Sequence, residues 1–322
     1  MLDFIWGLIY NPFWLFAYIF GILSVGQIAF EVAKMINREF LRTPLNLPER
    51  YGKGSWALIT GSTSEMGFEF CRQLAKQGFN IVFISTRLEV LQDSAHKLEI
   101  EYPQVKTKII EHDFAKKNTV DDYKQLKKDL NGIDISIIVN NAEIVTSKYF
   151  KDITPQESLD MVNVNCTSCT MLVHQFINDL LKREKRSAII NVGSLAGYAP
   201  TGFQGCYSGT QRMLKFFTYG LHDNYNNKID VLGLNPGTLK TKESQETSCY
   251  CITTPDVTVR NGLRDLGYEI ETTGFYAHTI KGGLISIFSR YATPIFDAVS
   301  KNCMEKKALE QFRKDHLAKK QS

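Results

Sequence analysis

Thr60-Gly61-Ser62-Thr63-Ser64-Glu65-Met66-Gly67 is the stretch of this 322-residue chain that decides the fold. It stands between a short apolar run at residues 56–59 and a segment of helix length that continues to residue 78. A glycine-containing turn between a strand and a helix presents backbone amides and the positive end of the helix dipole to a pyrophosphate. The stretch therefore predicts the phosphate-binding turn of a dinucleotide-binding fold.

Apolar runs of strand length recur along the chain, each followed by sequence of helix length. They lie at residues 80–85, 107–110, 135–139, 188–192 and 231–234, with a further helix expected at 88–102. Runs without polar alternation are typical of parallel strands that helices cover on both faces. Strand–helix–strand repeats with right-handed crossovers predict an α/β fold with a Rossmann-type doubly wound parallel sheet.

The N-terminal segment is apolar, and residues 4–30 contain no charged side chain. A helix that crosses a bilayer needs about 20 apolar residues, so this segment predicts a transmembrane helix that is retained as an anchor. Asp3 precedes it, whereas Lys34, Arg38 and Arg42 follow it. The positive-inside rule then places the rest of the chain on the cytoplasmic or matrix side. The pattern fits neither a cleavable signal peptide nor an arginine-rich presequence.

The chain is expected to have four parts: a membrane anchor at 1–40, a linker at 41–55, a Rossmann-fold domain at 56–250 and a C-terminal helical extension at 251–322. The extension contains a short apolar segment at 284–288, which we expect to form an interfacial or packed amphipathic helix. Its last residues, 301–322, carry seven Lys/Arg and three Asp/Glu, which accounts for the net charge of +4. This basic tail would contact anionic lipid or an acidic protein, or form a solvated helix.

The seven cysteines form no regular framework, which favours a reducing environment around the folded domain. Cys166 and Cys169 make a lone CxxC pair without a second pair or a histidine cluster, and we interpret them as positions in a helix core. No metal site and no nucleic-acid partner are expected.

Six motifs in the order and spacing of one enzyme family lie between residues 55 and 245. They are the stretch at 60–67, Asn140-Asn141-Ala142-Glu143, Asn165, Ser194, Tyr207 thirteen residues later, and Asn235-Pro236-Gly237 with Thr241. Together they resemble the short-chain dehydrogenase/reductase family. The anchor and the glycines of the C-terminal segment extend the resemblance to the branch of 17-beta-hydroxysteroid dehydrogenases and very-long-chain 3-ketoacyl-CoA reductases.

The resemblance implies roles for individual residues. Asn165, Ser194 and Tyr207 match the family's active-site asparagine, serine and tyrosine, and Gly61, Gly67 and Asn140 match its cofactor-binding positions. Arg87 could meet a 2′-phosphate, which would favour NADP(H), and Asp113 matches an acid that contacts adenine. Arg87 could equally be a solvated residue at a helix start, and Asp113 could be a turn former at a strand end.

One departure from the family concerns the tyrosine. In the family, a lysine one helical turn after the tyrosine lowers the tyrosine pKa and holds the nicotinamide ribose; here that position is Gln211. A free tyrosine titrates near pH 10, so Tyr207 without a cation would be a weaker proton donor. Arg212 is rotated by about 100° around the helix, whereas Lys215 shares the face of Gln211 about 6 Å further along the axis. Lys215 could therefore substitute.

Two further departures place carboxylates on the dinucleotide side. Glu65 stands where the family has the middle glycine of its phosphate-binding turn, and Glu143 replaces the glycine that lies against the cofactor. At ~4 Å, with an effective dielectric constant of 20, each charge pair would repel by roughly 4 kcal/mol, an upper bound because the side chain can turn outward. Together with Gln211, the two acids predict that cofactor binding is not maintained.

These departures predict a catalytically inactive family member without cofactor, which serves as a structural or accessory subunit of a membrane protein complex. Asn165, Ser194 and Tyr207 would then be relics that hydrogen-bond within the fold. One alternative is a protein that binds NADP(H) without turnover; another is an active NADPH-dependent reductase of a 3-ketoacyl-CoA or a steroid ketone. The expected location is the mitochondrial inner membrane or the endoplasmic reticulum membrane, with the domain facing the matrix or the cytosol.

Overall fold

The computed structural model describes residues 12–200, 202–241 and 252–291. The chain divides into two units, Met1–Thr43 and Pro44–Ser322. In the first unit, helix α2 (Pro12–Ile36) continues into a π-helical turn, η1 (Asn37–Leu41). The combined helix Phe13–Leu41 has a mean hydropathy of 1.8 in its most apolar window. It is therefore long and apolar enough to anchor the chain in a membrane.

In the second unit, the described strands form one parallel sheet in the order β3-β2-β1-β4-β5-β6-β7. The strands are β1 (Trp56–Thr60), β2 (Asn80–Ser85), β3 (Thr107–Glu111), β4 (Ile135–Asn140), β5 (Ser187–Val192), β6 (Ile229–Leu234) and β7 (Glu271–Thr272). Strand order reverses between β1 and β4, the topological switch point at which open α/β sheets bind ligands. The predicted doubly wound parallel sheet is confirmed, and β7 is an addition that the sequence pattern did not predict.

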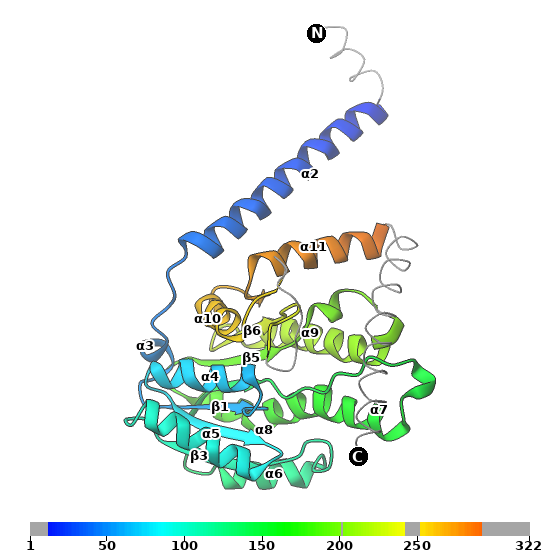
Figure 1. The fold of residues 1–322 in the computed structure, drawn as a ribbon. Coiled ribbons are helices and arrows are strands. Elements are labelled where there is room, and N and C mark those ends of the chain that lie inside the picture. Colours follow the sequence, from blue (N-terminus) through cyan, green and yellow to red (C-terminus); the bar gives the residue numbers. More distant parts are fainter. Residues whose placement is uncertain (1–11, 201, 242–251, 292–322) are drawn as a thin grey trace. The chain divides into compact units, whose positions relative to one another are not determined.

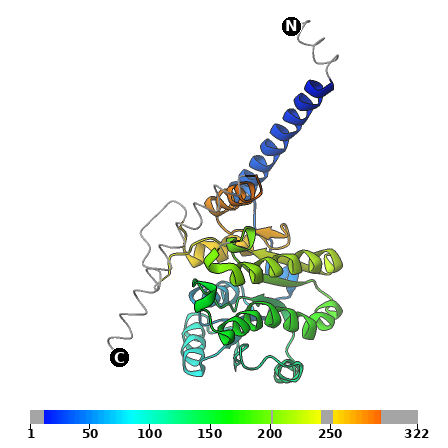
Figure 2. The same ribbon diagram turned by 90° about the vertical axis from the view of Figure 1, so that its right-hand side faces the viewer.

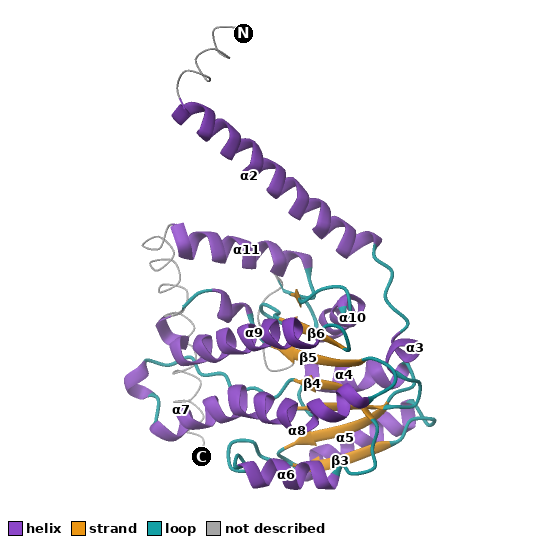
Figure 3. Cartoon of the chain, turned by 180° about the vertical axis from the view of Figure 1, so that it is seen from behind, coloured by secondary structure: helices purple, strands orange, loops and turns teal. Residues whose placement is uncertain are grey.

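Helices cover both faces of the sheet, as Figure 3 shows. On one face, α4 (Glu65–Lys76), α5 (Leu88–Glu101) and α10 (Pro255–Asp265) pack through side chains such as Phe70, Leu91 and Leu263. On the other, α6 (Val120–Asp129), α8 (Ser168–Lys182) and α9 (Gly205–Tyr225) pack through side chains such as Tyr123 and Leu172. This burial on two faces explains why the central strands contain apolar runs without polar alternation.

The segment that enters the sheet from the N-terminal side is fixed by a buried acid. Helix α3 (Leu47–Tyr51) follows Asn46, whose side chain caps it, and it buries Leu47 and Tyr51. Asp230 on β6 accepts hydrogen bonds from Arg50 Nε at 2.5 Å and from Tyr51 Oη at 2.7 Å. These bonds tie the first residues of the second unit to the sheet.

The C-terminal part of the described chain joins the same unit. The elements α10, β7 and α11 (Tyr276–Tyr291) follow β6, the last of the predicted strands. Earlier in the chain, the short helix α7 (Pro155–Val162) precedes α8. In Figures 1 and 2, α11 lies beside the elements formed by the C-terminal half of the chain. Gly282 of α11 packs on Leu195 of the 3-10 turn η4 (Leu195–Tyr198), whereas Ile280, Leu284 and Ile287 are exposed.

The division into parts at residues 1–40, 41–55, 56–250 and 251–322 stays a prediction. The compact unit begins at Pro44, within the predicted linker, and it includes the elements of residues 252–291. The basic tail at 301–322 lies outside the described residues.

Replacing the buried acid by its amide (Asp230→Asn) is expected to lower the free energy of unfolding by about 2–3 kcal/mol, because two arginines and a tyrosine lose their anion. Chemical denaturation of the detergent-solubilised full chain measures the change. Asp134→Asn is the matched control. Asp134 pairs with Arg183 at 2.7 Å, but its side chain is 61% exposed, so a loss below about 1 kcal/mol is expected.

Wild type and Asp230→Asn should also differ in how the free energy of unfolding depends on pH. Burial opposes ionisation of Asp230, but hydrogen bonds from Arg50, Arg186 and a tyrosine outweigh it and hold its pKa below the ordinary value. A group with a lowered folded pKa contributes stability above its unfolded pKa and loses it as pH falls through the folded pKa. The difference in the free energy of unfolding between wild type and Asp230→Asn should therefore shrink below pH about 4. A constant difference down to pH about 2 would contradict this assignment.

Candidate active site

A cavity of about 890 Å³ opens at the carboxyl ends of the parallel strands. Its wall is built from the residues that follow six strands in turn. These are 61 and 63–66 after β1, 85–86 at the end of β2, 112–114 after β3, 141–145 after β4, 192–194 at the end of β5, and 236–239 with 241 after β6. Val164 and Tyr207 complete it. The cavity therefore lies at the switch point where this sheet type binds dinucleotides.

The turn after β1 keeps the form that a phosphate-binding turn requires. Gly61 has a φ of 60°, a conformation that favours glycine. A Cβ atom on Gly67 would lie 2.2 Å from the Gly61 carbonyl oxygen, so the turn and the start of α4 need a glycine there to pack. Ser64 caps α4 by accepting a hydrogen bond from Gly67 N at 3.0 Å. The N-terminus of α4 thus faces the cavity with its dipole.

Glu65 does not distort this turn. It is the first residue of α4, and no non-glycine residue in the described ranges has a positive φ. A carboxylate in the first turn of a helix also interacts favourably with the helix dipole. The replacement of glycine therefore leaves the backbone of the turn intact and adds one acid to the cavity wall.

The phosphate turn is hydrogen-bonded to the segment after β4. Thr60 Oγ1 accepts from Asn141 N at 2.9 Å and from Ala142 N at 3.0 Å. Asn141 Nδ2 donates to the carbonyl oxygens of Thr60 at 3.0 Å and Gly61 at 3.1 Å. These bonds hold the two segments together on opposite sides of the switch point.

Asn140 lies behind the cavity and is not part of its wall. Its amide donates to Asn191 Oδ1 at 2.8 Å, and Asn191 Nδ2 donates to Thr218 Oγ1 at 2.9 Å. This buried chain ties β4 and β5 to α9. A role in cofactor binding therefore stays a prediction, whereas its contact with Asn191 fixes neighbouring strands.

Asn165 holds the backbone that follows Glu143. It lies in the π-helical turn η3 (Asn163–Thr167), a type of irregularity that is frequent at functional sites. Its Oδ1 accepts from Ile144 N at 2.8 Å, and its Nδ2 donates to Ile144 O at 3.0 Å and to Thr210 Oγ1 at 3.1 Å. Asn165 does not line the cavity but positions a segment that does.

Ser194, Tyr207 and Glu143 meet in the cavity wall. Tyr207 Oη donates a hydrogen bond to Glu143 Oε2 at 3.0 Å. Burial raises the pKa of Tyr207, the Glu143 charge raises it further, and a hydrogen bond with Ser194 opposes the rise. Glu143 is exposed to the cavity but enclosed by the domain, and this enclosure raises its pKa to about 7, against the effect of the Tyr207 hydrogen bond. The tyrosine thus touches an acid that titrates near neutral pH.

No cation takes the place of the missing lysine within the described residues. Gln211 is buried, and its Oε1 has no hydrogen-bond partner there. Lys215 Nζ pairs with Glu271 Oε1 at 2.8 Å and lies 4.0 Å from the centre of the Tyr198 ring. Arg212 is exposed and lies over the ring of Phe216. Among the described lining residues there is no lysine or arginine.

The two residues expected at the adenosine end differ in position. Asp113 lines the cavity and accepts a hydrogen bond from Ala115 N at 3.0 Å. Arg87 precedes the first residue of α5 and is exposed. It does not belong to the cavity wall, although Thr86 does. A contact between Arg87 and a 2′-phosphate stays a prediction.

Sequence reasoning missed the residues that hold the loop after β6. Asn235 Nδ2 donates to Glu271 Oε1 at 2.9 Å, and Gly237 N donates to His278 Nδ1 at 3.0 Å. Glu271 belongs to the two-residue strand β7, which is too short to show a periodic pattern. His278 stands alone in its segment, so nothing in the sequence linked it to the loop.

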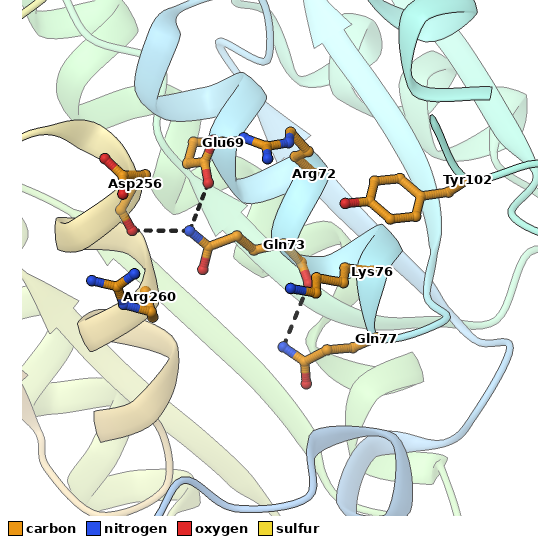
Figure 4. Close-up of a pocket in the computed structure, with 8 residues that line it drawn as sticks. All are labelled: Glu69, Arg72, Gln73, Lys76, Gln77, Tyr102, Asp256 and Arg260. Carbon is orange, nitrogen blue, oxygen red and sulfur yellow. Dashed lines mark hydrogen bonds and ion pairs between the residues drawn. The ribbon is translucent and has the colours of Figure 1, made fainter. Parts of the chain in front are cut away.

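A second hollow, of about 550 Å³, lies between α4 and α10 (Figure 4). Gln73 crosses it and donates to Glu69 Oε1 at 2.7 Å and to the Asp256 carbonyl oxygen at 2.9 Å. Arg72 is also engaged, since it pairs with Glu69 and Glu101. This hollow shares no lining residue with the strand-end cavity, and its polar side chains join two helices.

A nicotinamide dinucleotide fits the strand-end cavity by the chemistry of its wall. The N-terminus of α4 and the hydroxyls of Thr63 and Ser64 suit a pyrophosphate, and Ser194 with Tyr207 lies at the other side of the switch point. The model of the family described as "short chain dehydrogenase" matches residues 55–249. The chain belongs to this family.

Similar proteins share both the sequence and the fold. A protein of Anas platyrhynchos named very-long-chain 3-oxoacyl-CoA reductase is 32% identical over 242 residues, which cover 73% of this chain and 76% of that protein. A solved 7beta-hydroxysteroid dehydrogenase has a TM-score of 0.70 at 22% identity and covers 80% of this chain and all of its own. A short-chain dehydrogenase from Sphingobium yanoikuyae, solved with NADPH, has a TM-score of 0.57 at 22% identity, with 64% and 82% covered.

These findings overturn two expectations. The relative at 32% identity is named as a reductase, and the family is one of dehydrogenases, so the prediction of an inactive accessory subunit is wrong. The prediction of a site without cofactor is wrong for the same reason, and a neighbour in the same fold was solved with NADPH. The physical reason is that the two acids were expected only to repel phosphate, whereas the structure shows an intact turn at Glu65 and a contact of Glu143 to Tyr207. No finding supports partner subunits or a mitochondrial location.

Asn165→Ala is expected to lower the free energy of unfolding by about 2 kcal/mol, because the backbone N–H and C=O of Ile144 both lose their partner. It should also speed hydrogen exchange at residues 143–146. Asn118→Ala is the control and is expected to cost less, since the Asn118 side chain donates a hydrogen bond only to the Ala115 carbonyl oxygen among the described residues. Unchanged exchange at 143–146 would show that Asn165 does not hold this segment.

Proposed function

We propose that this chain is a membrane-anchored, NADPH-dependent reductase that converts the 3-keto group of a long acyl thioester to a 3-hydroxyl group. The observation that carries the proposal is the meeting of Ser194 and Tyr207 in the wall of a dinucleotide-sized cavity at the switch point. The named activity of the Anas platyrhynchos relative supports the choice of substrate class.

In this proposal, a bound NADPH supplies a hydride to the carbonyl carbon. Tyr207 Oη donates the proton that the carbonyl oxygen needs, and Ser194 Oγ donates a hydrogen bond that polarises the carbonyl. Asn165 keeps the segment at 143–145 in place through Ile144. Each of these groups is fixed by secondary structure, so the approach of the ketone to Tyr207 costs little reorganisation.

The cofactor would lie along the strand ends. Gly61 and Gly67 shape the turn for the pyrophosphate, Asp113 in the wall would contact the adenine ring, and Arg87 would reach a 2′-phosphate from the exposed start of α5. Asn140 would support this arrangement from behind, through Asn191.

The location that we propose is the endoplasmic reticulum membrane, with the domain facing the cytosol. The apolar helix Phe13–Leu41 is followed by Arg42, and it contains Lys34 and Arg38 near its end. This charge asymmetry orients the C-terminal side of the helix towards the cytosol. An anchored enzyme also meets its apolar acyl substrate where such chains dissolve.

The detergent-solubilised full chain is expected to oxidise NADPH in the presence of a long-chain 3-oxoacyl-CoA, and less rapidly with a steroid ketone. Tyr207→Phe should lower kcat by at least ~10²-fold, because the proton donor is lost. Ser194→Ala should act in the same direction. Tyr268→Phe, at an exposed tyrosine outside the cavity wall, is the control. Absence of turnover in the wild-type chain with every ketone tested would refute the proposed function.

Charged substitutions in the apolar helix test whether it anchors the chain in a membrane. Two lysines near the middle of the apolar helix (Ile19→Lys with Ile22→Lys) should cost about 5–7 kcal/mol of insertion free energy. The altered chain is then expected in the supernatant after alkaline carbonate extraction of membranes, whereas wild type and the control Ile19→Val with Ile22→Val stay in the pellet. Retention of the lysine variant in the pellet would contradict anchoring by this helix.

A further inference from the structure

The tyrosine of this site has an unusual ionisable partner. Tyr207 Oη contacts the carboxyl group of Glu143 at 3.0 Å, and the position one helical turn after Tyr207 holds the uncharged Gln211. Lys215, the next lysine on that face, is paired with Glu271. Within the described residues, the ionisable group that contacts Tyr207 Oη is therefore an acid and not a cation.

We propose that Glu143 is the group that resupplies the proton of Tyr207 during ketone reduction, and that it is protonated when the cofactor is bound. This inference rests on the proposed reductase function. Glu143 acts through Tyr207 and does not itself touch the ketone in this scheme. This role would be particular to this chain, since the family motif that the chain otherwise resembles has glycine at the position of Glu143.

The proton and electron balance is complete. The carbonyl carbon gains the hydride that NADPH supplies, and the C=O π bond becomes a lone pair on oxygen, which takes the proton of Tyr207 Oη to give the hydroxyl product. The Tyr207 phenolate then takes the proton of the Glu143 carboxylic acid along the 3.0 Å line between the two oxygens. The Glu143 carboxylate regains a proton from water, because its side chain is exposed to the cavity.

The backbone on both sides of Glu143 is fixed, so its position opposite Tyr207 is a property of the fold. On one side, Ala142 N donates to Thr60 Oγ1 at 3.0 Å. On the other, Ile144 is held at its N–H and at its C=O by Asn165. A proton relay requires such fixed geometry, because transfer needs heavy atoms within about 2.6–3.2 Å.

Burial, rather than a neighbouring charge, favours the protonated form of Glu143. Apart from Tyr207, the other titratable groups in the described part of the cavity wall are Glu65 on α4 and His112 and Asp113 after β3. Burial lowers the pKa of His112, so it adds no positive charge at neutral pH. The pKa of Glu143 is already raised to about 7. An anionic dinucleotide in the same cavity would raise it further, so binding should be accompanied by proton uptake.

The sign of the pH dependence follows. The protonated form of Glu143 is required for both binding and proton resupply, so both weaken as pH rises above its pKa. If Glu143 only packs against Tyr207, kcat shows no such loss in this range, because Tyr207 with its raised pKa keeps its proton. The pH dependence therefore separates the proposed pair from an arrangement in which Glu143 only packs against Tyr207.

The test measures NADPH binding by fluorescence titration and reductase kcat, both from pH about 6 to 9, on detergent-solubilised full chains. For wild type, we expect kcat to fall about tenfold per pH unit at the alkaline end, and NADPH affinity to weaken several-fold. Glu143→Gln keeps a hydrogen-bonding group but has no proton to supply. It should bind NADPH with affinity that no longer depends on pH, and its kcat should fall at least ~10-fold. Glu184→Gln, at an exposed glutamate after α8, is the matched control.

A rescue variant gives a second readout. The double replacement Glu143→Gly with Gln211→Lys should recover part of the kcat lost in Glu143→Gly alone, and its alkaline loss should move to higher pH. Folding of each variant is checked by thermal unfolding.

If wild type turns over but Glu143→Gln keeps the same kcat and the same pH profile, the role of Glu143 is wrong and the reductase function stands. If wild type binds NADPH but reduces no ketone, the proposed function and this inference both fail.

Discussion

The hydrogen bonds between Thr60 and Asn141 are the constraint on which the site depends. At the switch point, the chain leaves β1 and β4 in opposite directions, and this divergence opens the cavity. Without a tie, the two loops would be free to separate. Thr60 Oγ1 accepts from two successive backbone amides, Asn141 and Ala142, while Asn141 Nδ2 donates to the carbonyl oxygens of Thr60 and Gly61. The same tie fixes Glu143, so the cofactor end and the proton end of the site share one support.

A substitution at a glycine position removes the conformational freedom and small size of glycine, and it also adds a side chain. From sequence, the added carboxyl groups of Glu65 and Glu143 were expected only to repel the phosphates of a cofactor. At residue 65 the backbone has an ordinary helical conformation, so glycine was not needed there to form the turn. At residue 143 the added carboxyl group reaches Tyr207 and takes a pKa of about 7. In the proposed reduction, this carboxyl group can supply the proton that Tyr207 passes to the carbonyl oxygen.

The strands and the phosphate-binding turn could be predicted from sequence because both follow from strongly local signals. Apolar runs gave six strands within two residues, and the residues after those runs form the cavity wall. The contacts of long side chains across the fold could not be predicted in this way. Glu271 and His278 support the loop after β6, yet β7 has two residues and α11 shows no motif. Likewise, helical geometry placed Lys215 near Gln211, but the partner that captures its ammonium group comes from β7.

The ion pair of Lys215 with Glu271 explains why Lys215, one turn further along α9, does not replace the lysine that is missing at position 211. Glu271 accepts hydrogen bonds from Lys215, Tyr198, Tyr219 and Asn235. Burial opposes its ionisation, but Lys215 first, and then Tyr198 and Tyr219, keep its pKa below the ordinary value. Withdrawing Lys215 towards Tyr207 would leave this acid half-buried with its main counter-charge gone, which costs several kcal/mol in such surroundings. The loop after β6 would lose its support at the same time, because Asn235 shares the acid. The lysine is therefore bound to the structural network, and Tyr207 is left with the partner that the β4 loop presents.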